Sequence, residues 1–152
     1  MLQPDLEYVG FWLRVVASVI DSVLVMIVTW PLLFWIYGVA YVQADSFTII
    51  RGPADFLISW LLPAAAIIWF WVAQKGQTPG KRAVGAMIVD AQTGAPLSVR
   101  QAVIRYLGYF VSMLGLFIGF IWVGFDPKKQ GWHDHIAGTV VVRKKTVVKF
   151  GR

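Results

Sequence analysis

Arg14 and Asp21 are the residues whose types and spacing most directly suggest chemistry, because both lie inside a long apolar segment. They are seven positions apart, about two helical turns, so a helix would place them on one face about 10 Å apart along its axis. An ionised aspartate inside a bilayer costs about 2.5–3.5 kcal/mol on insertion scales, so Asp21 should face protein or a polar cavity, pair with a cation or carry a proton. Arg14 is the nearest candidate partner, and Arg105 is another. Two roles stay open: a carboxylate that handles a proton or cation, and an ion pair that locks helices together.

The segment GQTPGKR, residues 76–82, invites comparison with a phosphate-binding loop but lacks its pattern. The interval between its glycines is one residue short, and neither serine nor threonine follows Lys81. Thr78, Pro79 and Gly80 are typical of a tight turn. We expect the basic pair that follows this turn, and a second basic pair later in the chain, to contact lipid head groups; the four residues are Lys81, Arg82, Lys128 and Lys129.

Two histidines flank an aspartate in His133-Asp134-His135, and Asp126 lies a few positions earlier. Imidazole and carboxylate groups can bind a metal ion, but a structural zinc site usually has four ligands, and the chain has no cysteine to complete one. The sequence therefore favours a helix cap or a polar network at the membrane surface, and it predicts neither a metal nor a cofactor. Because no Ser/His/Asp arrangement for nucleophilic catalysis is evident, we expect no enzymatic activity.

The composition is that of a membrane protein. Of the 152 residues, 58% are hydrophobic and 14% are charged, and the mean hydropathy is +0.66; a soluble domain is nearer half apolar and a quarter charged. The 8 tryptophans, 10 phenylalanines and 5 tyrosines suit the membrane interface, where amphipathic rings lie at head-group depth. The net charge of +6 comes from residues that flank apolar segments, which indicates membrane lipids rather than nucleic acid as partners.

Three apolar segments dominate the chain, at about residues 11–42, 56–73 and 102–125. About 20 apolar residues span a bilayer as a helix. The sequence therefore predicts an all-α integral membrane helical bundle with two membrane-crossing helices and a third apolar segment that either spans or bends back, near Gly115, as two short helices. The first segment is longer than one span requires, and Pro31 is expected to kink it.

The distribution of charge predicts the orientation of the chain. The basic loop at residues 75–101 is expected in the cytoplasm, which places residues 43–55 outside and the N-terminus inside. The C-terminal tail is also basic, although a third crossing would put it outside. Two β-rich stretches, residues 83–90 and 139–143, are too short to span, and their pairing at the cytoplasmic face would require an even number of crossings between them. This pairing favours the bent arrangement of residues 102–125.

The motifs together resemble the RDD family of small polytopic bacterial membrane proteins, whose name refers to one arginine and two aspartates. The resemblance rests on YVGFWLRVVASVID, GQTPGKRAVGAMIVDAQTGAPLS, RQAVIRYLGY and FDPKKQGWHDHIAGTVVVR, in this order. It covers about residues 8–143 of a single domain over residues 1–152, and it leaves residues 144–152 as a basic tail.

The resemblance implies that Arg14, Asp21 and Asp134 are the residues of the family name, with Asp126 as the alternative for the second aspartate. It also implies a multi-pass protein of the bacterial inner (plasma) membrane. Some members of the family are linked to cation/proton exchange, but the family as a whole implies no settled activity.

Two hypotheses for the function follow. The first is a small transporter or cation/proton exchanger, in which Asp21 takes up a proton or monovalent cation and Arg14 sets its affinity. One short chain offers few helices to enclose a pathway, so this hypothesis predicts a homo-oligomer, and the Gly115-x-x-x-Gly119 spacing permits close helix contact. The second is a non-catalytic membrane assembly or lipid- or partner-binding module, in which the Arg/Asp set is structural.

Overall fold

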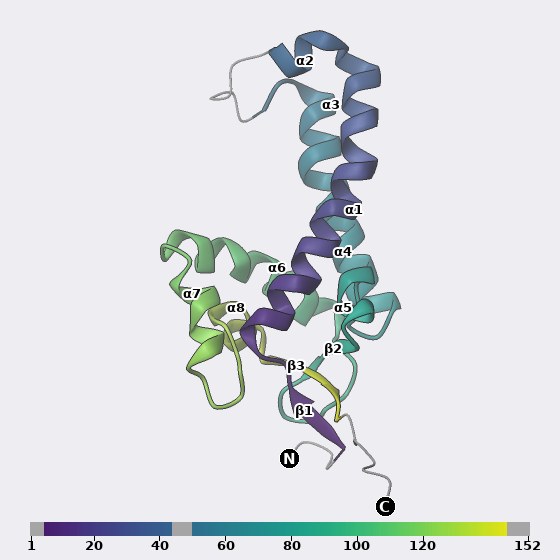
Figure 1. The fold of residues 1–152 in the computed structure, drawn as a ribbon. Coiled ribbons are helices and arrows are strands. Elements are labelled where there is room, and N and C mark those ends of the chain that lie inside the picture. Colours follow the sequence, from purple (N-terminus) through teal and green to yellow (C-terminus); the bar gives the residue numbers. More distant parts are fainter. Residues whose placement is uncertain (1–4, 44–49, 146–152) are drawn as a thin grey trace, which may run out of the picture.

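The computed structural model describes residues 5–43 and 50–145 and is mostly helical. Two long apolar helical segments stand side by side as a hairpin (Figure 1). The first is α1 (Phe11–Tyr37), and the second, Pro53–Ala73, is built from α3 (Pro53–Phe56), the π-helical turn η1 (Leu57–Leu61) and α4 (Leu62–Ala73). Both are long and apolar enough to cross a membrane. The two predicted apolar helices are therefore confirmed.

Helix α1 is shorter than the first apolar segment of the sequence. Pro31 lies inside it without ending it. The helix ends at Tyr37 because Gly38 adopts a φ of 64°, a left-handed conformation that favours glycine. The short helix α2 (Val39–Gln43) follows this break.

A three-stranded antiparallel sheet lies at one end of the helical hairpin (Figure 1). Its strands are β1 (Leu6–Tyr8), β2 (Ala86–Asp90) and β3 (Thr139–Lys144), in the order β1-β3-β2. The register pairs Ala86 with Arg143 and Asp90 with Thr139, so the predicted pairing of the two β-rich stretches is confirmed. Strand β1 was not predicted; its three residues are too few to show a pattern.

The third apolar segment bends back and does not form one straight helix. It consists of α6 (Val99–Leu114), α7 (Ile118–Ile121) and the 3₁₀ turn η2 (Trp122–Gly124), with an angle of 115° between its two halves. Leu116 and Phe117 make the bend at φ values of 53° and 62°, a left-handed conformation that bulky residues rarely adopt. The bend lies beside Gly115, where the sequence predicts it, and it returns the chain to the sheet.

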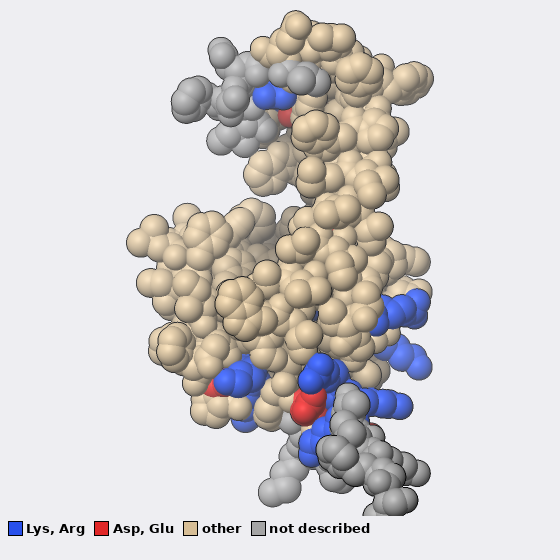
Figure 2. Space-filling view, in the orientation of Figure 1, with Lys and Arg blue, Asp and Glu red and all other residues tan. Residues whose placement is uncertain are grey.

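The sheet and the helix ends around it enclose the core. Away from this end, most of the molecular surface is apolar. The ends of the helices pack here together with α5 (Pro79–Ala83) and α8 (Trp132–Ala137). The core cluster consists of Val9, Trp71, Ala86, Ile88, Leu97, Ala102 and Val141. Figure 2 shows that most visible basic side chains gather at this end, whereas apolar surface covers most of the remainder. Such an exposed apolar surface suits lipid surroundings.

Candidate functional site

Asp134, in the first turn of α8, is the centre of a buried charge cluster. Its carboxylate is fully buried and lies between two arginines: Arg14 Nη1 donates to Asp134 Oδ2 over 2.5 Å, and Arg105 Nη1 donates to Asp134 Oδ1. Oδ2 also accepts the backbone N–H of Gly131 over 2.9 Å, which caps the start of α8. Arg105 Nη1 reaches Thr139 Oγ1 over 2.7 Å as well. One carboxylate therefore joins α1, α6, α8 and β3.

Arg14 makes further contacts that hold the start of α1 in place. Its Nε donates to the carbonyl of Val9 over 3.0 Å, and its Nη2 donates to the carbonyl of Lys129 over 2.5 Å. The fork of donors on a guanidinium group suits such multiple binding. Arg14 thus donates its hydrogen bonds to Asp134 and to nearby backbone carbonyl groups.

The two candidate partners of Asp21, Arg14 and Arg105, therefore both pair with Asp134 and not with Asp21. Side chains lean toward the N-terminus of a helix, so Arg14 reaches back to the sheet end, away from Asp21 two turns further along. Asp21 instead accepts neutral donors: Thr78 Oγ1 over 2.5 Å and the backbone N–H of Gly80 over 2.7 Å.

The turn that holds Asp21 depends on a close approach of α1 and α5. Thr78 caps α5, because its Oγ1 accepts the backbone N–H of Lys81 over 3.3 Å. A Cβ atom on Gly80 would collide with the carbonyl oxygen of Ala17 and come within 2.9 Å of Asp21 Cγ. The GQTPGKR motif is thus a polar connection between the end of α4 and α1, and not a phosphate-binding loop.

A cavity of about 870 Å³ opens between α1, α4, α6 and α7. Most of its lining is apolar, and its charged residues are Arg14, Asp21, Lys81 and Arg105, with His133 beside them. Asp134 does not line it. Asp134 and Asp21 therefore differ: Asp134 is enclosed by arginines, whereas Asp21 faces the cavity.

The surroundings shift the pKa values of three groups in this region that lie outside the apolar helices. Burial raises the pKa of Asp134, but Arg105 and Arg14 outweigh burial and hold it well below its usual range. Burial lowers the pKa of His133 to about 3, although Asp134 opposes the shift. Burial also lowers the pKa of Lys81 to about 8, and Arg105 adds to the shift. His133 is therefore neutral at pH 7, and Lys81 can exchange its proton near that pH.

His133 also takes part in a contact that the sequence does not reveal. Its Nδ1 lies 3.3 Å from Ser112 Oγ, and its Nε2 lies 3.5 Å from Asp134 Oδ2. Ser112 is fully buried and donates to the carbonyl of Gly108 over 3.0 Å, so this Ser/His/Asp set is a packing arrangement with an inaccessible hydroxyl. A Cβ atom on Gly108 would come within 2.9 Å of His133 Cα, which explains the glycine there.

The remaining predicted residues lie outside the cluster. Asp126 accepts the backbone N–H groups of Lys128 and Gln130 over 2.9 and 3.1 Å and lies 3.0 Å from His135 Nε2, so it organises its own loop. Among the described residues, no group of three or more His, Cys, Asp or Glu side chains could hold a metal ion.

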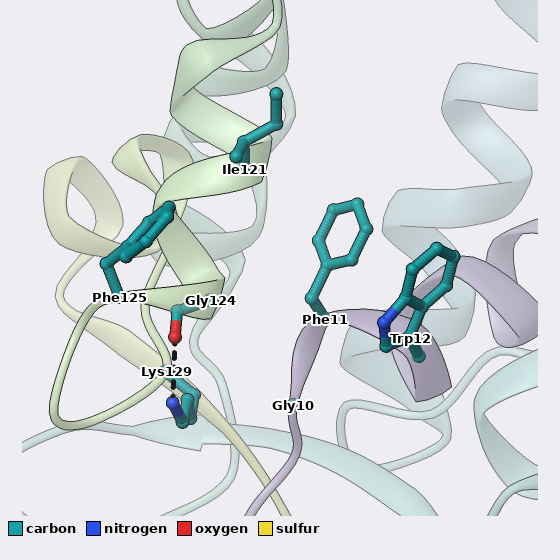
Figure 3. Close-up of a pocket in the computed structure, with 7 residues that line it drawn as sticks. All are labelled: Gly10, Phe11, Trp12, Ile121, Gly124, Phe125 and Lys129. Atoms are coloured by element: carbon teal, nitrogen blue, oxygen red, sulfur yellow. Dashed lines mark hydrogen bonds between the residues drawn. The ribbon is translucent and has the colours of Figure 1, made fainter.

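The four basic residues that we expected to contact lipid head groups lie in different surroundings. Arg82 and Lys128 are exposed, Lys129 is half-buried, and Lys81 lines the cavity. Lys129 Nζ donates to the carbonyl of Gly124 over 3.0 Å, beside a second, smaller cavity of about 590 Å³ (Figure 3). Phe11, Trp12 and Phe125 border this smaller cavity at the start of α1.

A separate polar cluster lies at the opposite end of the hairpin, and the sequence did not single it out. Asp55 is buried and accepts Tyr41 Oη over 2.9 Å, Ser59 Oγ over 2.8 Å and the backbone N–H of Arg51 over 2.7 Å. Its own N–H donates to Tyr37 Oη over 3.1 Å. These bonds hold the start of the second apolar helical segment against the end of α1 and against α2.

Comparisons with known proteins agree with the motifs. A model of the RDD family matches residues 8–138. The protein YxaI of Bacillus subtilis is 32% identical over 89% of this chain and 97% of its own length. The membrane protein YteJ of the same organism is 29% identical over 91% of this chain and 82% of its own length. The proline-rich antigen of Mycobacterium leprae is 30% identical over 59% of this chain, which covers 37% of that protein.

No solved structure matches this chain. The family match spans Arg14, Asp21, Arg105 and Asp134 together with both apolar helices. The family and these helices indicate a membrane protein, and the chain belongs to the RDD family.

Proposed function

We propose that this protein is a small proton-coupled membrane transporter in which Asp21 carries the proton. The observation behind the proposal is the contrast between the two aspartates. Asp21 lines the large cavity, and its donors among the described residues, Thr78 and Gly80, are neutral, so it can gain a proton without breaking an ion pair with any of these residues. A carboxylate in such a setting is a functional candidate by default.

Asp134 has the opposite role in this proposal. It is fully buried between Arg14 and Arg105, and protonating it would leave two arginines without their counter-charge. It is therefore a structural lock that holds α6 and α8 against α1. Under this assignment Asp21 carries the proton, whereas Arg14 and Asp134 form a structural ion pair.

The balance of charge argues against a metal cation as the transported species. Arg14, Lys81 and Arg105 line the polar end of the cavity with Asp21, and Asp134 pairs with the two arginines outside the lining. Three cations against two carboxylates leave a net positive charge, which repels sodium or potassium. The proposal keeps the proton part of the predicted cation/proton exchange because a proton, unlike sodium or potassium, forms a covalent bond with the Asp21 carboxylate.

The second candidate function is a non-catalytic module that binds anionic lipid head groups. The basic side chains at the sheet end support it (Figure 2), because anionic lipids attract such a surface. Under either function we propose a cytoplasmic location for the sheet end in the bacterial inner membrane, since basic residues favour that side. The exposed bend at Leu114, Leu116 and Phe117 is then placed in lipid or against a second copy of the chain.

Proton flux across vesicles that contain the purified protein tests the proposal. A pH-sensitive dye inside the vesicles reports proton movement when a gradient of sodium, potassium or decanesulfonate is imposed. The sulfonate stays ionised, so it carries no proton by itself. We expect proton flux that depends on the protein and disappears in Asp21→Asn.

The asparagine is a conservative probe. Its amide can still accept from Gly80 and bond to Thr78, but it cannot take up a proton. Asp126→Asn, which changes a carboxylate outside the cavity, is the control and should keep the flux. If no gradient drives flux through the natural protein, the lipid-binding module is the better account. If Asp21→Asn transports equally well, Asp21 is not the proton carrier.

A further inference from the structure

Two residues that line the polar end of the large cavity hold buried hydrogen-bond donors for which the described part of the chain supplies no acceptor. Trp71 Nε1 and Arg105 Nε are buried, and among the described residues neither finds a hydrogen-bond partner. Both side chains are only 1% exposed, and both line the cavity. A buried donor without a partner is costly, so these two N–H groups require an acceptor from elsewhere.

Lys81 adds a third donor at the same place. Its Nζ lies 5.7 Å from the centre of the Trp71 ring, and the Arg105 guanidinium carbon lies 5.4 Å from the same ring. The described part of the chain offers Lys81 no ion-pair partner. Asp21 is close enough to influence it, but both Asp21 oxygens already accept from Thr78 and Gly80.

The rest of the cavity is apolar. Its walls come from α1, α4 and the bent pair α6–α7, and they include Met26, Pro63, Ile67, Met113 and Phe120. The volume of about 870 Å³ falls within the range of sites that bind small molecules. The cavity therefore combines a long apolar space with one positively charged end that is rich in donors.

We infer that this cavity binds an amphiphile with an apolar chain and a compact oxyanion head, such as a carboxylate, phosphate or sulfonate. Lys81, Trp71 and Arg105 bind the head, and the apolar walls contact the chain. A neutral chain would leave the donors unpaired, and a small anion without a chain would leave the apolar walls unfilled. The role of this amphiphile as cargo rests on the proposed function, whereas its binding does not.

Binding to the whole protein in phosphatidylcholine nanodiscs tests the inference with three matched probes. Decanesulfonate has both the chain and the head, methanesulfonate has the head alone, and decanol has the chain alone. We expect decanesulfonate to bind at least about tenfold more tightly than decanol, and methanesulfonate not to bind measurably. Equal affinity for decanesulfonate and decanol would contradict the inference, because the head would then contribute nothing. Measurable binding of methanesulfonate would reassign the site to free anions.

Two substitutions locate the head group. Lys81→Gln removes the charge, and Trp71→Phe removes the N–H while it keeps an aromatic ring. Each should weaken decanesulfonate binding several-fold or more and leave decanol binding unchanged. Arg82→Gln removes a neighbouring charge that is exposed on the same helix and should change neither. If both Lys81→Gln and Trp71→Phe bind decanesulfonate as the natural protein does, the inference is wrong.

The binding and flux experiments fail independently. Binding without flux would leave the amphiphile site in place and remove the transporter. Proton flux with sodium or potassium but without decanesulfonate binding would keep the transporter and remove this ligand.

Discussion

Asp134 and Arg14 lie 120 residues apart in the chain, yet Arg14 Nη1 donates to Asp134 Oδ2 over 2.5 Å. The bond joins the start of the first apolar helix to the short helix before the last strand. Because α8 also packs closely on α6, the same bond holds the bent third segment near the hairpin. The wall of the large cavity therefore depends on an ion pair whose carboxylate, Asp134, does not itself line the cavity.

Asp134→Asn should destabilise the protein strongly. The substitution leaves Arg14 and Arg105 buried without a counter-charge, a change that typically costs about 3–5 kcal/mol. Thermal or denaturant unfolding in detergent measures it. Glu7→Gln is the control, because it breaks only the partly exposed Glu7–Arg143 pair, which is worth about 0–1 kcal/mol. Similar losses of unfolding free energy in the two variants would contradict the structural role of Asp134.

Gly80→Ala should loosen the contact between α1 and α5. The added Cβ would collide with the carbonyl oxygen of Ala17 and crowd Asp21, and overpacking of this kind costs about 1–3 kcal/mol. Gly124→Ala is the matched control, since a Cβ there meets no atom within 4 Å among the described residues. Unfolding experiments should show a loss for the first variant only; unchanged stability in Gly80→Ala would mean that the close approach is not required.

Amphiphile binding should weaken as the pH rises through about 8. Burial lowers the pKa of Lys81 to about 8, and an oxyanion prefers the protonated ammonium that exists below this value. Decanesulfonate stays ionised throughout, so the part of the pH dependence from about pH 6.5 to pH 9.5 that Lys81→Gln removes reports Lys81. The affinity of Lys81→Gln should be lower and independent of pH. A bound anion raises the pKa of Lys81, so the observed midpoint should lie above 8; a rise in affinity with pH would have the wrong sign.

The pairing of the strands predicts which parts of the chain share one side of the membrane. Residues in the turn after β2 and at the end of β3 should share one side, and a residue at the far end of the hairpin should lie on the other. The chain has no cysteine, so single cysteines at Gln92, Lys144 and Ile50 can be labelled in intact cells with an impermeant reagent. We expect labelling at Ile50 only. Different accessibility of Gln92 and Lys144 would contradict the sheet.

The sequence predicted the elements of the fold better than the contacts of the site. The β-rich composition of two stretches suggested that they pair, and because a sheet requires both strands on one side of the membrane, this pairing favoured the bend beside Gly115. Helical spacing, by contrast, suggested a pair between Arg14 and Asp21. Spacing along one helix shows which residues share a face, but it does not show that Asp134, far along the chain, offers Arg14 a better partner.

The donor cluster of the cavity could not be predicted from the sequence. Trp71 lies in α4, Lys81 in α5 and Arg105 in α6, the first half of the bent third segment. Each is individually typical of a membrane interface. Only the packing of α4, α5 and α6 around one indole ring brings their donors together.

The central claim is that Asp21 carries the transported proton and that Asp134 has a structural role. Proton flux driven by a decanesulfonate gradient tests it most directly. The natural protein in phosphatidylcholine vesicles should move protons when the gradient is imposed. Asp21→Asn should lose this flux while it keeps nearly normal unfolding stability. Undiminished flux in folded Asp21→Asn, or no flux through the natural protein, would contradict the account.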